Sequence, residues 1–274
     1  MLQSISPITK VFQTSGSNPV KVLCSDVNEY VCKYSRSNLA TGLFNEYLAA
    51  VFLKIWKLRV PDFSIVTIQP NHVTDEFISN TVQPRFFQIP TFGSKYIEHA
   101  KEIDPSIVAI EDDKKLIKKI VNKEDLLAIS LFDLWMGNED RSHNNYNLLL
   151  QTDPDYVFMP IDHERCFNGN SMTVDRGMVL LTEEETLLNT ELTSLILRNF
   201  KGLPALVEEI ASNYYLWVAD CEESLENTVN SMPDQWGIAK ADKITLLRAT
   251  LFQQSWIDEC KNTFKDYATR FLLS

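Results

Sequence analysis

Glycine, cysteine and long apolar runs are scarce in this sequence. Its 274 residues include 8 glycines and 5 cysteines. The cysteines are odd in number and form no C-x-x-C pair, which argues against a disulfide framework and against a zinc site. No apolar run approaches the roughly 18 residues that cross a bilayer, and the first residues lack the basic and apolar regions of a signal peptide. We therefore expect a cytoplasmic protein with reduced thiols and no membrane span.

An excess of positive charge is also absent. The chain has 26 Lys and Arg against 37 Asp and Glu, a formal net charge of −11. Because binding to a phosphate backbone needs clustered basic side chains, this charge disfavours nonspecific nucleic-acid binding. The charge is also uneven, since residues 1–100 carry 9 basic and 7 acidic side chains and residues 101–274 carry 17 and 30. This asymmetry predicts a molecule in two parts, which the length allows.

The first part, residues 1–95, has the pattern of a strand-rich lobe with one helix. Val20–Cys24 and Tyr30–Tyr34 are rich in β-branched and aromatic residues and flank a polar turn, which predicts a hairpin. Lys33 lies near the end of the second strand. Lys33 is either an ordinary surface lysine on an edge strand, or its long side chain points its charged end toward one face of the sheet.

A helix is predicted over Leu43–Lys57, and Val60–Ile68 reads as a further buried strand of the same sheet. The helix carries its apolar residues at helical spacing. Glu46 lies in its first turns, thirteen residues after Lys33. Taken alone, this glutamate fits a solvated position near a helix N-terminus, where the helix dipole favours negative charge.

The most concentrated polar segment is Gly137–Leu150, and a helix is predicted to lead into it. Asn122 is the expected N-cap of this helix, with Asp125 three residues on. Leucines and Trp135 then recur at helical spacing. Gly137 and the asparagine after it are expected to end the helix.

Two short strands are predicted after the polar segment, at Leu148–Gln151 and Tyr156–Ile161, joined by a turn that contains a proline. Asp140 and Asn145 stand five residues apart before the hairpin, and Asp162 follows it, so the three side chains are expected to converge at one sheet edge. A carboxylate that accepts a hydroxyl proton, with Asn and Asp as hard oxygen ligands for Mg²⁺, is the set that phosphoryl transfer needs. Alternatively, Asp140 and Asn145 only cap turns of the loop.

These motifs resemble a known family. The run Asn138-Glu-Asp-Arg141 with Asn145, followed by Ile161-Asp-His163, resembles the HipA-like kinases and, more distantly, the phosphatidylinositol 4-kinases. The resemblance covers residues 14–167 by motif. It implies an α+β, two-lobed protein-kinase-like fold: a strand-rich nucleotide-binding lobe with one main helix at residues 1–95 and a mostly helical catalytic lobe at residues 96–274.

The resemblance also implies roles for single residues. Asp140 would be the catalytic base, and Asn145 and Asp162 the metal ligands. Lys33 would lie on the α- and β-phosphates of ATP, braced by Glu46, as a strand lysine and a helix glutamate are arranged in kinases.

Two further residues of the polar segment have expected roles. His143 is a candidate for contacting the transferred phosphate or orienting Asp140, and otherwise stabilises the loop. Arg141 is expected to pair with Asp133 or Asp162, since its guanidinium favours bidentate contact with a carboxylate.

The chain departs from the kinase pattern in several places. No Gly-rich loop precedes Lys33, and the candidate phosphate-covering segment is Thr14–Pro19, with Ser15, Gly16 and Ser17 as cofactor-binding residues. An ordinary turn explains the same residues. No Ala-Pro-Glu segment follows Asp162.

Further elements are assigned on both sides of the polar segment. In kinase terms, the strand that approaches the adenine-contacting hinge is expected at Pro84–Pro90. Helices are predicted at residues 186–199, 203–231 and 240–273. The last is a long helix, either continuous or interrupted by a break.

Taken together, the resemblance implies an ATP- and Mg²⁺-dependent bacterial kinase that transfers the γ-phosphate to a protein Ser or Thr. A cognate antitoxin or regulator protein is an implied partner. Two alternatives remain at this stage: a non-catalytic, pseudokinase-like nucleotide-binding module, and a kinase of lipids or small molecules.

Overall fold

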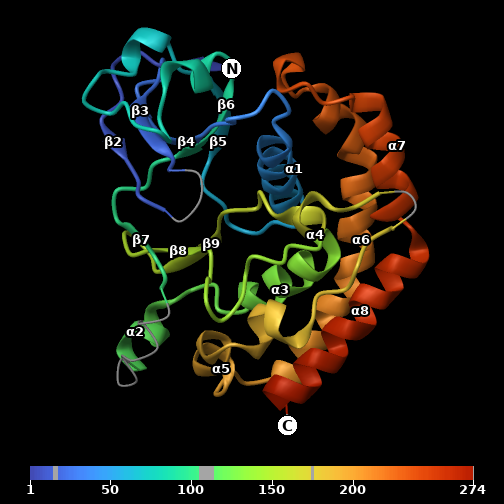
Figure 1. Ribbon diagram of the computed structural model, residues 1–274. Helices are drawn as coiled ribbons and strands as arrows, with labels where there is room; N and C mark the ends of the chain where they lie inside the picture. Colours follow the sequence, from blue (N-terminus) through green and yellow to red (C-terminus); the bar gives the residue numbers. More distant parts are fainter. Residues whose placement is uncertain (15–17, 105–113, 174–175, 274) are drawn as a thin grey trace.

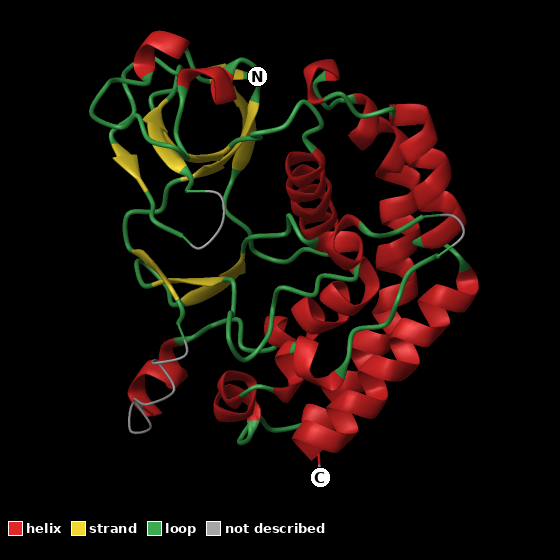
Figure 2. Cartoon of the chain, in the orientation of Figure 1, coloured by secondary structure: helices red, strands yellow, loops and turns green. Residues whose placement is uncertain are grey.

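A six-stranded sheet forms the first part of the molecule (Figures 1 and 2). The structure is a computed structural model that describes residues 1–14, 18–104, 114–173 and 176–273. The strand order is β1-β5-β6-β4-β3-β2. The strands are β1 (Leu2–Gln3), β2 (Lys10–Val11), β3 (Val20–Leu23), β4 (Glu29–Lys33), β5 (Phe63–Thr67) and β6 (Thr91–Lys95).

The predicted hairpin of β3 and β4 is confirmed, with Lys21 opposite Val31. β4 also pairs with β6, where Lys33 stands opposite Phe92, so Lys33 is on an inner strand and the edge-strand alternative is wrong. Residues of a strand alternate between faces. Because Cys32 is fully buried in the core on one face of the sheet, Lys33 points to the other.

The helix α1 (Thr41–Ile55) lies between this sheet and the long helices of the second part (Figure 1). Its predicted position is confirmed within two residues. The helix is buried along most of its length and contacts both β6 and α6 (Leu203–Asn230). A helix with neighbours on two sides needs apolar residues around most of its surface, which its sequence supplies.

The expected strand at Pro84–Pro90 is wrong. Pro84–Phe87 form a 3₁₀ turn, and the strand that approaches the second part is β6, which begins directly after Pro90. Proline has no N–H to donate to a strand ladder, so a proline at each end leaves this stretch unsuited to the sheet. Its aromatic side chains pack instead, with the ring centroids of Phe87 and Tyr34 4.6 Å apart.

A smaller antiparallel sheet follows, formed by β7 (Ala100–Glu102), β8 (Leu148–Gln151) and β9 (Val157–Pro160). The predicted hairpin is therefore confirmed. The helix α3 (Asp125–Met136) ends at Gly137, whose φ of 58° is left-handed, as a glycine C-cap requires.

Asn122 does not cap α3. Its side-chain amide donates to the carbonyl oxygen of Phe158 at 2.9 Å and accepts from the backbone N–H of Phe158 at 2.9 Å. It therefore acts as an added strand partner for β9, and the helix begins three residues later, at Asp125.

Helices dominate the rest of the chain. In the stretch 240–273, residues 251–253 separate two α-helices, and a π-helix (Thr269–Leu273) follows the second one. The stretch 186–199 contains one 3₁₀ turn, Leu187–Asn189, and one α-helix, α5 (Glu191–Leu197). The remaining α-helices of the described residues are α2 (Lys114–Lys119), α4 (Cys166–Asn170), α5 (Glu191–Leu197), α7 (Lys240–Thr250) and α8 (Gln254–Ala268). Within the described residues, no helix has the length and apolar character that crossing a membrane needs.

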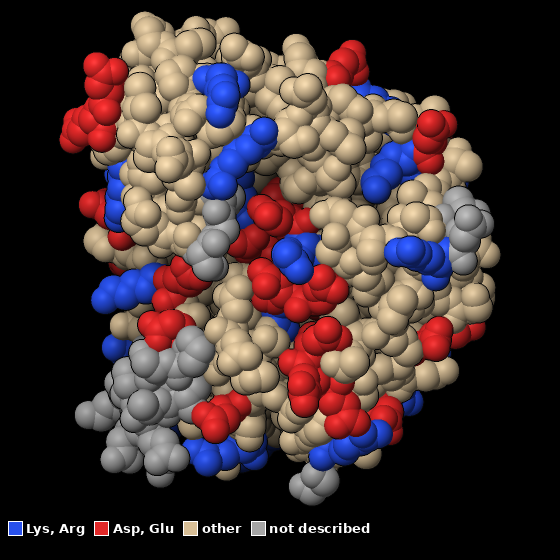
Figure 3. Space-filling model, viewed as in Figure 1, with Lys and Arg blue, Asp and Glu red and all other residues tan. Residues whose placement is uncertain are grey.

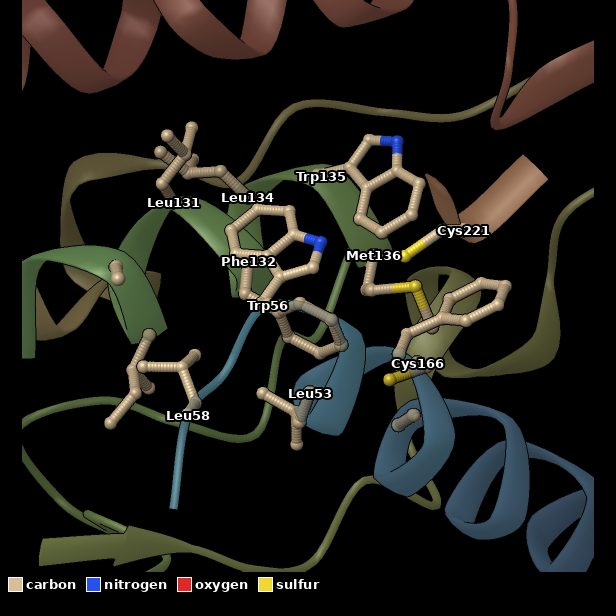
Figure 4. Packing of buried hydrophobic residues seen from close by; sticks show 14 of the residues in the cluster. Leu53, Trp56, Leu58, Leu131, Phe132, Leu134, Trp135, Met136, Cys166 and Cys221 are labelled. Atoms are coloured by element: carbon tan, nitrogen blue, oxygen red, sulfur yellow. The ribbon is translucent and has the colours of Figure 1, made fainter. Parts of the chain in front are cut away.

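Aromatic packing joins α1 to α3 (Figure 4). The Trp56 ring, at the end of α1, lies 5.1 Å from the ring of Phe132 and 5.7 Å from that of Trp135, centroid to centroid. All three rings are buried. Large aromatic side chains dominate the energetics of a core, so this cluster fixes α1 on the helical part. The fold is thus a mixed α+β one, a curled sheet beside a helical part.

Candidate active site

Lys33 is at the centre of a buried charge cluster. Its Nζ atom donates to Oε1 of Glu46 at 2.5 Å and to Oδ1 of Asp162 at 2.6 Å. The Lys33 side chain is only 14% exposed. Burial alone lowers the pKa of a lysine, but the two carboxylates outweigh it and raise the pKa of Lys33, so the ammonium stays charged.

Glu46 is buried, and the solvated alternative is wrong. Burial raises the pKa of its carboxyl group, and the Lys33 ammonium opposes that rise. Its Oε1 atom also accepts the backbone N–H of His163 at 3.1 Å. One carboxylate thereby holds both the strand lysine and the segment that follows β9.

Asp162 is the second carboxylate on Lys33, and its side chain is 34% exposed. Burial opposes its ionisation, but the Lys33 ammonium outweighs burial and holds the pKa of Asp162 below its usual range. Its backbone has a φ of 59°, a left-handed conformation that Asp tolerates better than most residues. Asp162 is therefore a charged carboxylate that solvent reaches.

The polar loop, residues 138–147, brings Asp140 beside two asparagines. Asn145 Nδ2 lies 3.4 Å from Oδ2 of Asp140, and Asn147 Nδ2 lies 3.2 Å from the same oxygen and 3.0 Å from the Asp140 carbonyl oxygen. Asn147 is buried, whereas Asp140 and Asn145 are half-buried. Two amide donors thus orient the Asp140 carboxylate.

Arg141 holds the polar loop from inside. It is fully buried and donates from Nε to Oδ2 of Asp133 at 2.7 Å, which decides between the two predicted partners. It also donates to the carbonyl oxygens of Tyr146, Asn147 and Ile161. Because Ile161 directly precedes Asp162, this one side chain connects the loop that carries Asp140 to the segment that carries Asp162.

His163 is buried against Arg141, whose Nη2 atom lies 2.9 Å from its Nε2. Burial first, and then the charges of Arg141 and Lys33, hold the pKa of His163 well below its usual range. The imidazole is therefore neutral, and its Nε2 accepts from Arg141.

Acidic side chains gather in the hollow between the sheet and the helical part (Figure 3). Ligand oxygens of Glu46, Asp162 and Glu164 all lie within 4.8 Å of one another. Amide and carboxylate oxygens are hard ligands of the kind that Mg²⁺ prefers. Nδ2 of Asn145 faces Asp140, so Oδ1 is its free ligand atom. Asn145 and Asp162 therefore fit a divalent metal by their chemistry, and Glu164, with Glu46, is a further carboxylate beside Asp162.

The predicted residues are not all brought together. Lys33, Glu46 and Asp162 meet in one cluster, and Asp140 and Asn145 meet in the polar loop. His143 is exposed, and its catalytic role stays a prediction. Ser15, Gly16 and Ser17 lie outside the described residues.

Sequence reasoning missed Asn147 and Glu164. The polar loop contains several asparagines, and spacing alone does not show that Asn147 is the one turned inward. Glu164 stands two residues after Asp162, and that closeness was the available signal.

Comparison with known proteins identifies a family and similar folds. The family model of the HipA-like kinases matches residues 5–179. The crystal structure of the Helicobacter pylori proinflammatory kinase CtkA is similar, with a TM-score of 0.55 and 13% sequence identity over 97% of this chain and 98% of that one. The Golgi casein kinase gives a TM-score of 0.47 and 12% identity over 95% of this chain and 73% of that one.

No curated protein matches the sequence. The similarity to CtkA shows a protein-kinase-like fold. Since the family model spans more than half of the sequence, the chain belongs to the HipA-like kinase family.

Proposed function

We propose that this kinase is ATP- and Mg²⁺-dependent and transfers the γ-phosphate to a hydroxyl group, with a protein Ser or Thr as the acceptor. The observation that carries the proposal is the meeting of Lys33 from β4, Glu46 from α1 and Asp162 from the segment after β9. A buried, charged lysine between two carboxylates is held in one place, as positioning of a nucleotide phosphate requires.

Asp140 is the proposed catalytic base. Its carboxylate is half-buried and is oriented by the side-chain amides of Asn145 and Asn147. Such a carboxylate accepts the proton of the acceptor hydroxyl as that oxygen attacks the γ-phosphorus. Little other covalent chemistry is asked of the protein, so catalysis rests on positioning and charge.

Asn145 and Asp162 are the proposed metal ligands. When bound, Mg²⁺ supplies positive charge that neutralises the phosphate oxygens. Arg141 supports both ligands, because it bonds the backbone within the polar loop and just before Asp162.

The same proposal divides the chain at residue 95. The last strand of the six-stranded sheet, β6, ends at Lys95, which supports residues 1–95 as the nucleotide-binding lobe and residues 96–274 as the catalytic lobe. Family membership supports a protein acceptor and a cognate regulator protein in the bacterial cytoplasm, but names neither.

The test is phosphoryl transfer from ATP labelled at the γ-phosphate, with wild type and Asp140→Asn compared. The substitution keeps the shape of the side chain and removes its basicity. We expect the variant to bind Mg²⁺·ATP as wild type does and to lose about 100-fold or more of the transfer, the range of general-base catalysis. Equal transfer by both proteins would exclude Asp140 as the base.

The acceptors offered in this assay are the protein itself, generic proteins and phosphoinositides. Transfer to protein hydroxyls supports the proposal, and acid hydrolysis of the labelled protein identifies Ser or Thr. Transfer to lipid alone would assign a lipid kinase. Nucleotide binding without transfer to any acceptor would instead favour the non-catalytic module.

A further inference from the structure

The chain makes a left-handed turn five residues after Asp162. In the segment α4, Phe167, Asn168 and Gly169 have φ values of 61°, 51° and 61°, and Asn170 follows at 69°. L-residues avoid this region because Cβ approaches a carbonyl oxygen, and they visit it singly rather than in runs. A run that includes a buried phenylalanine therefore has to be held by its surroundings.

One side chain of α1 holds much of this turn. Asn45 is fully buried, and its Nδ2 atom donates to Oδ1 of Asn170 at 2.7 Å and to the carbonyl oxygen of Glu164 at 2.8 Å. A longer contact of 3.4 Å reaches the carbonyl oxygen of Cys166. A single amide thus binds the whole stretch from residue 164 to residue 170.

The other side of the turn contacts the start of the polar loop. The backbone N–H of Asn168 donates to the carbonyl oxygen of Gly137 at 2.9 Å. The Asn168 side chain also accepts the backbone N–H of Val179 and donates to the Val179 carbonyl oxygen, both at 2.9 Å. The left-handed turn therefore connects α1 to the end of α3 and to the segment near residue 179.

Asn45 directly precedes Glu46, the residue that holds Lys33. Both side chains bind the same segment, Glu46 through the backbone N–H of His163 and Asn45 through residues 164–170. Lys33 is also bound to Asp162, at the start of this segment. A displacement of α1 away from the segment would therefore draw Glu46 and Asp162 apart and strain the contact of Glu46 with Lys33.

We propose that Asn45 and Asn170 are positioning residues, whose hydrogen bond fastens α1 to the left-handed turn and so keeps Glu46 on Lys33. The effect on nucleotide binding rests on the proposed function, in which Lys33 contacts the phosphates. The fastening itself does not depend on any nucleotide.

Asn170 is the residue to change, because its side chain is exposed. Asn170→Gly keeps the left-handed backbone at no steric cost and removes the Oδ1 acceptor. Asn170→Asp keeps an acceptor for Asn45 and still tolerates positive φ. Both variants lose the 3.4 Å contact from Asn170 Nδ2 to the Glu164 carbonyl oxygen, so their difference isolates the contact with Asn45.

The first measurement is hydrogen exchange of the α1 amides without nucleotide. We expect exchange around Glu46 to be about 3- to 10-fold faster in Asn170→Gly, the factor that one hydrogen bond of ordinary net strength represents. Exchange in β3 and β4 should not change, and Asn170→Asp should match wild type within about twofold. Asn45→Asp, which turns a carboxylate toward carbonyl oxygens, should show the same change more strongly. Unchanged exchange in α1 would overturn the proposal.

The second measurement is a double-mutant cycle on the dissociation constant of Mg²⁺·ATP. We expect Asn170→Gly to weaken binding about 3- to 10-fold in wild type and to have no further effect once Glu46→Ala is present, because the side chain that contacts Lys33 and His163 is then already gone. Additive effects, or equal weakening by Gly and Asp at position 170, would overturn the positioning role. Absence of nucleotide binding in wild type would instead overturn the proposed function, and the exchange experiment would still decide the fastening.

Discussion

Arg141 shows how one buried residue sets the geometry of this site. Its guanidinium reaches Asp133 on α3, carbonyl oxygens within the polar loop and the carbonyl oxygen of Ile161. Asn138 supports the same carboxylate, with Nδ2 2.8 Å from Oδ1 of Asp133. Because a planar fork of donors fits such a set, lysine would not replace Arg141.

The buried ion pair gives the first prediction. Asp133→Asn should lower the free energy of unfolding by about 3–5 kcal/mol, because it leaves the Arg141 charge buried and uncompensated. Denaturant unfolding measures this loss. The matched control is Glu226→Gln, which breaks an exposed pair with Arg248 and should cost less than about 1 kcal/mol. Similar losses in both variants would contradict the structural role of the Arg141–Asp133 pair.

Asn147 gives the second prediction at this scale. Its φ of 46° suits glycine, so Asn147→Gly keeps the backbone and removes both amide contacts to Asp140. We expect the rate of phosphoryl transfer to fall about 10- to 100-fold while the affinity for Mg²⁺·ATP stays within about twofold, since the base is misoriented and the nucleotide is not. A variant with wild-type turnover would show that Asn147 does not orient Asp140.

At the scale of elements, substitution of the glycine that ends α3 and of a glycine inside α1 should have opposite effects on stability. Gly137 has positive φ, and an added Cβ would lie 2.8 Å from Cε of Met178 and 3.3 Å from the backbone nitrogen of Asn168. Gly42 lies in α1, where an added Cβ would make an ordinary contact at 3.5 Å with Glu164. One position requires glycine and the other does not.

The third prediction follows from this contrast. Gly137→Ala should destabilise the protein by at least about 1–2 kcal/mol, the cost of a left-handed L-residue. Gly42→Ala should stabilise it by about 0.4–1 kcal/mol, because alanine restricts the unfolded chain at a compatible position. Thermal or denaturant unfolding gives both values, and a change of the same sign in both variants would contradict the assigned backbone conformations.

Elements with a strong local pattern were predictable from the sequence. Both hairpins and the helix over Leu43–Lys57 depend on periodicity and turn residues within a few positions. Asn122 and Pro84–Pro90 were misassigned because their partners are distant. Asn122 bonds a strand 36 residues away, and no local rule separates that role from a helix cap.

The site divides in the same way. A known motif lists the residue types of the candidate site in chain order. It therefore allowed site roles to be predicted for Lys33, Glu46, Asp140, Asn145 and Asp162. The left-handed turn was not predicted, since only one of its four residues is a glycine. Its conformation is imposed by contacts with α1, α3 and the segment near residue 179, and such contacts exist only in the folded chain.

At the scale of the whole molecule, the site joins the two parts of the chain. Lys33 is on the six-stranded sheet, whereas Glu46 is on a helix that aromatic rings fix to the helical part (Figure 4). Asp162 follows the smaller sheet. Acidic side chains line the hollow between the two parts (Figure 3). Under the proposed function, a polyanionic nucleotide bound there would need both Lys33 and a divalent cation.

The stability of the whole protein in the presence of Mg²⁺·ATP tests this account most directly. Wild type should gain about 2.7 kcal/mol in free energy of unfolding at a ligand concentration one hundred times the dissociation constant. Asp162→Asn keeps the left-handed backbone and removes the charge of the proposed metal ligand. The gain in free energy of unfolding of this variant should therefore be the same with Mg²⁺·ATP as with ATP and a chelator that removes Mg²⁺. An unfolding transition of wild type that does not respond to millimolar Mg²⁺·ATP, or a magnesium-dependent gain that survives in Asp162→Asn, would contradict the assignment of this cluster as the nucleotide and metal site.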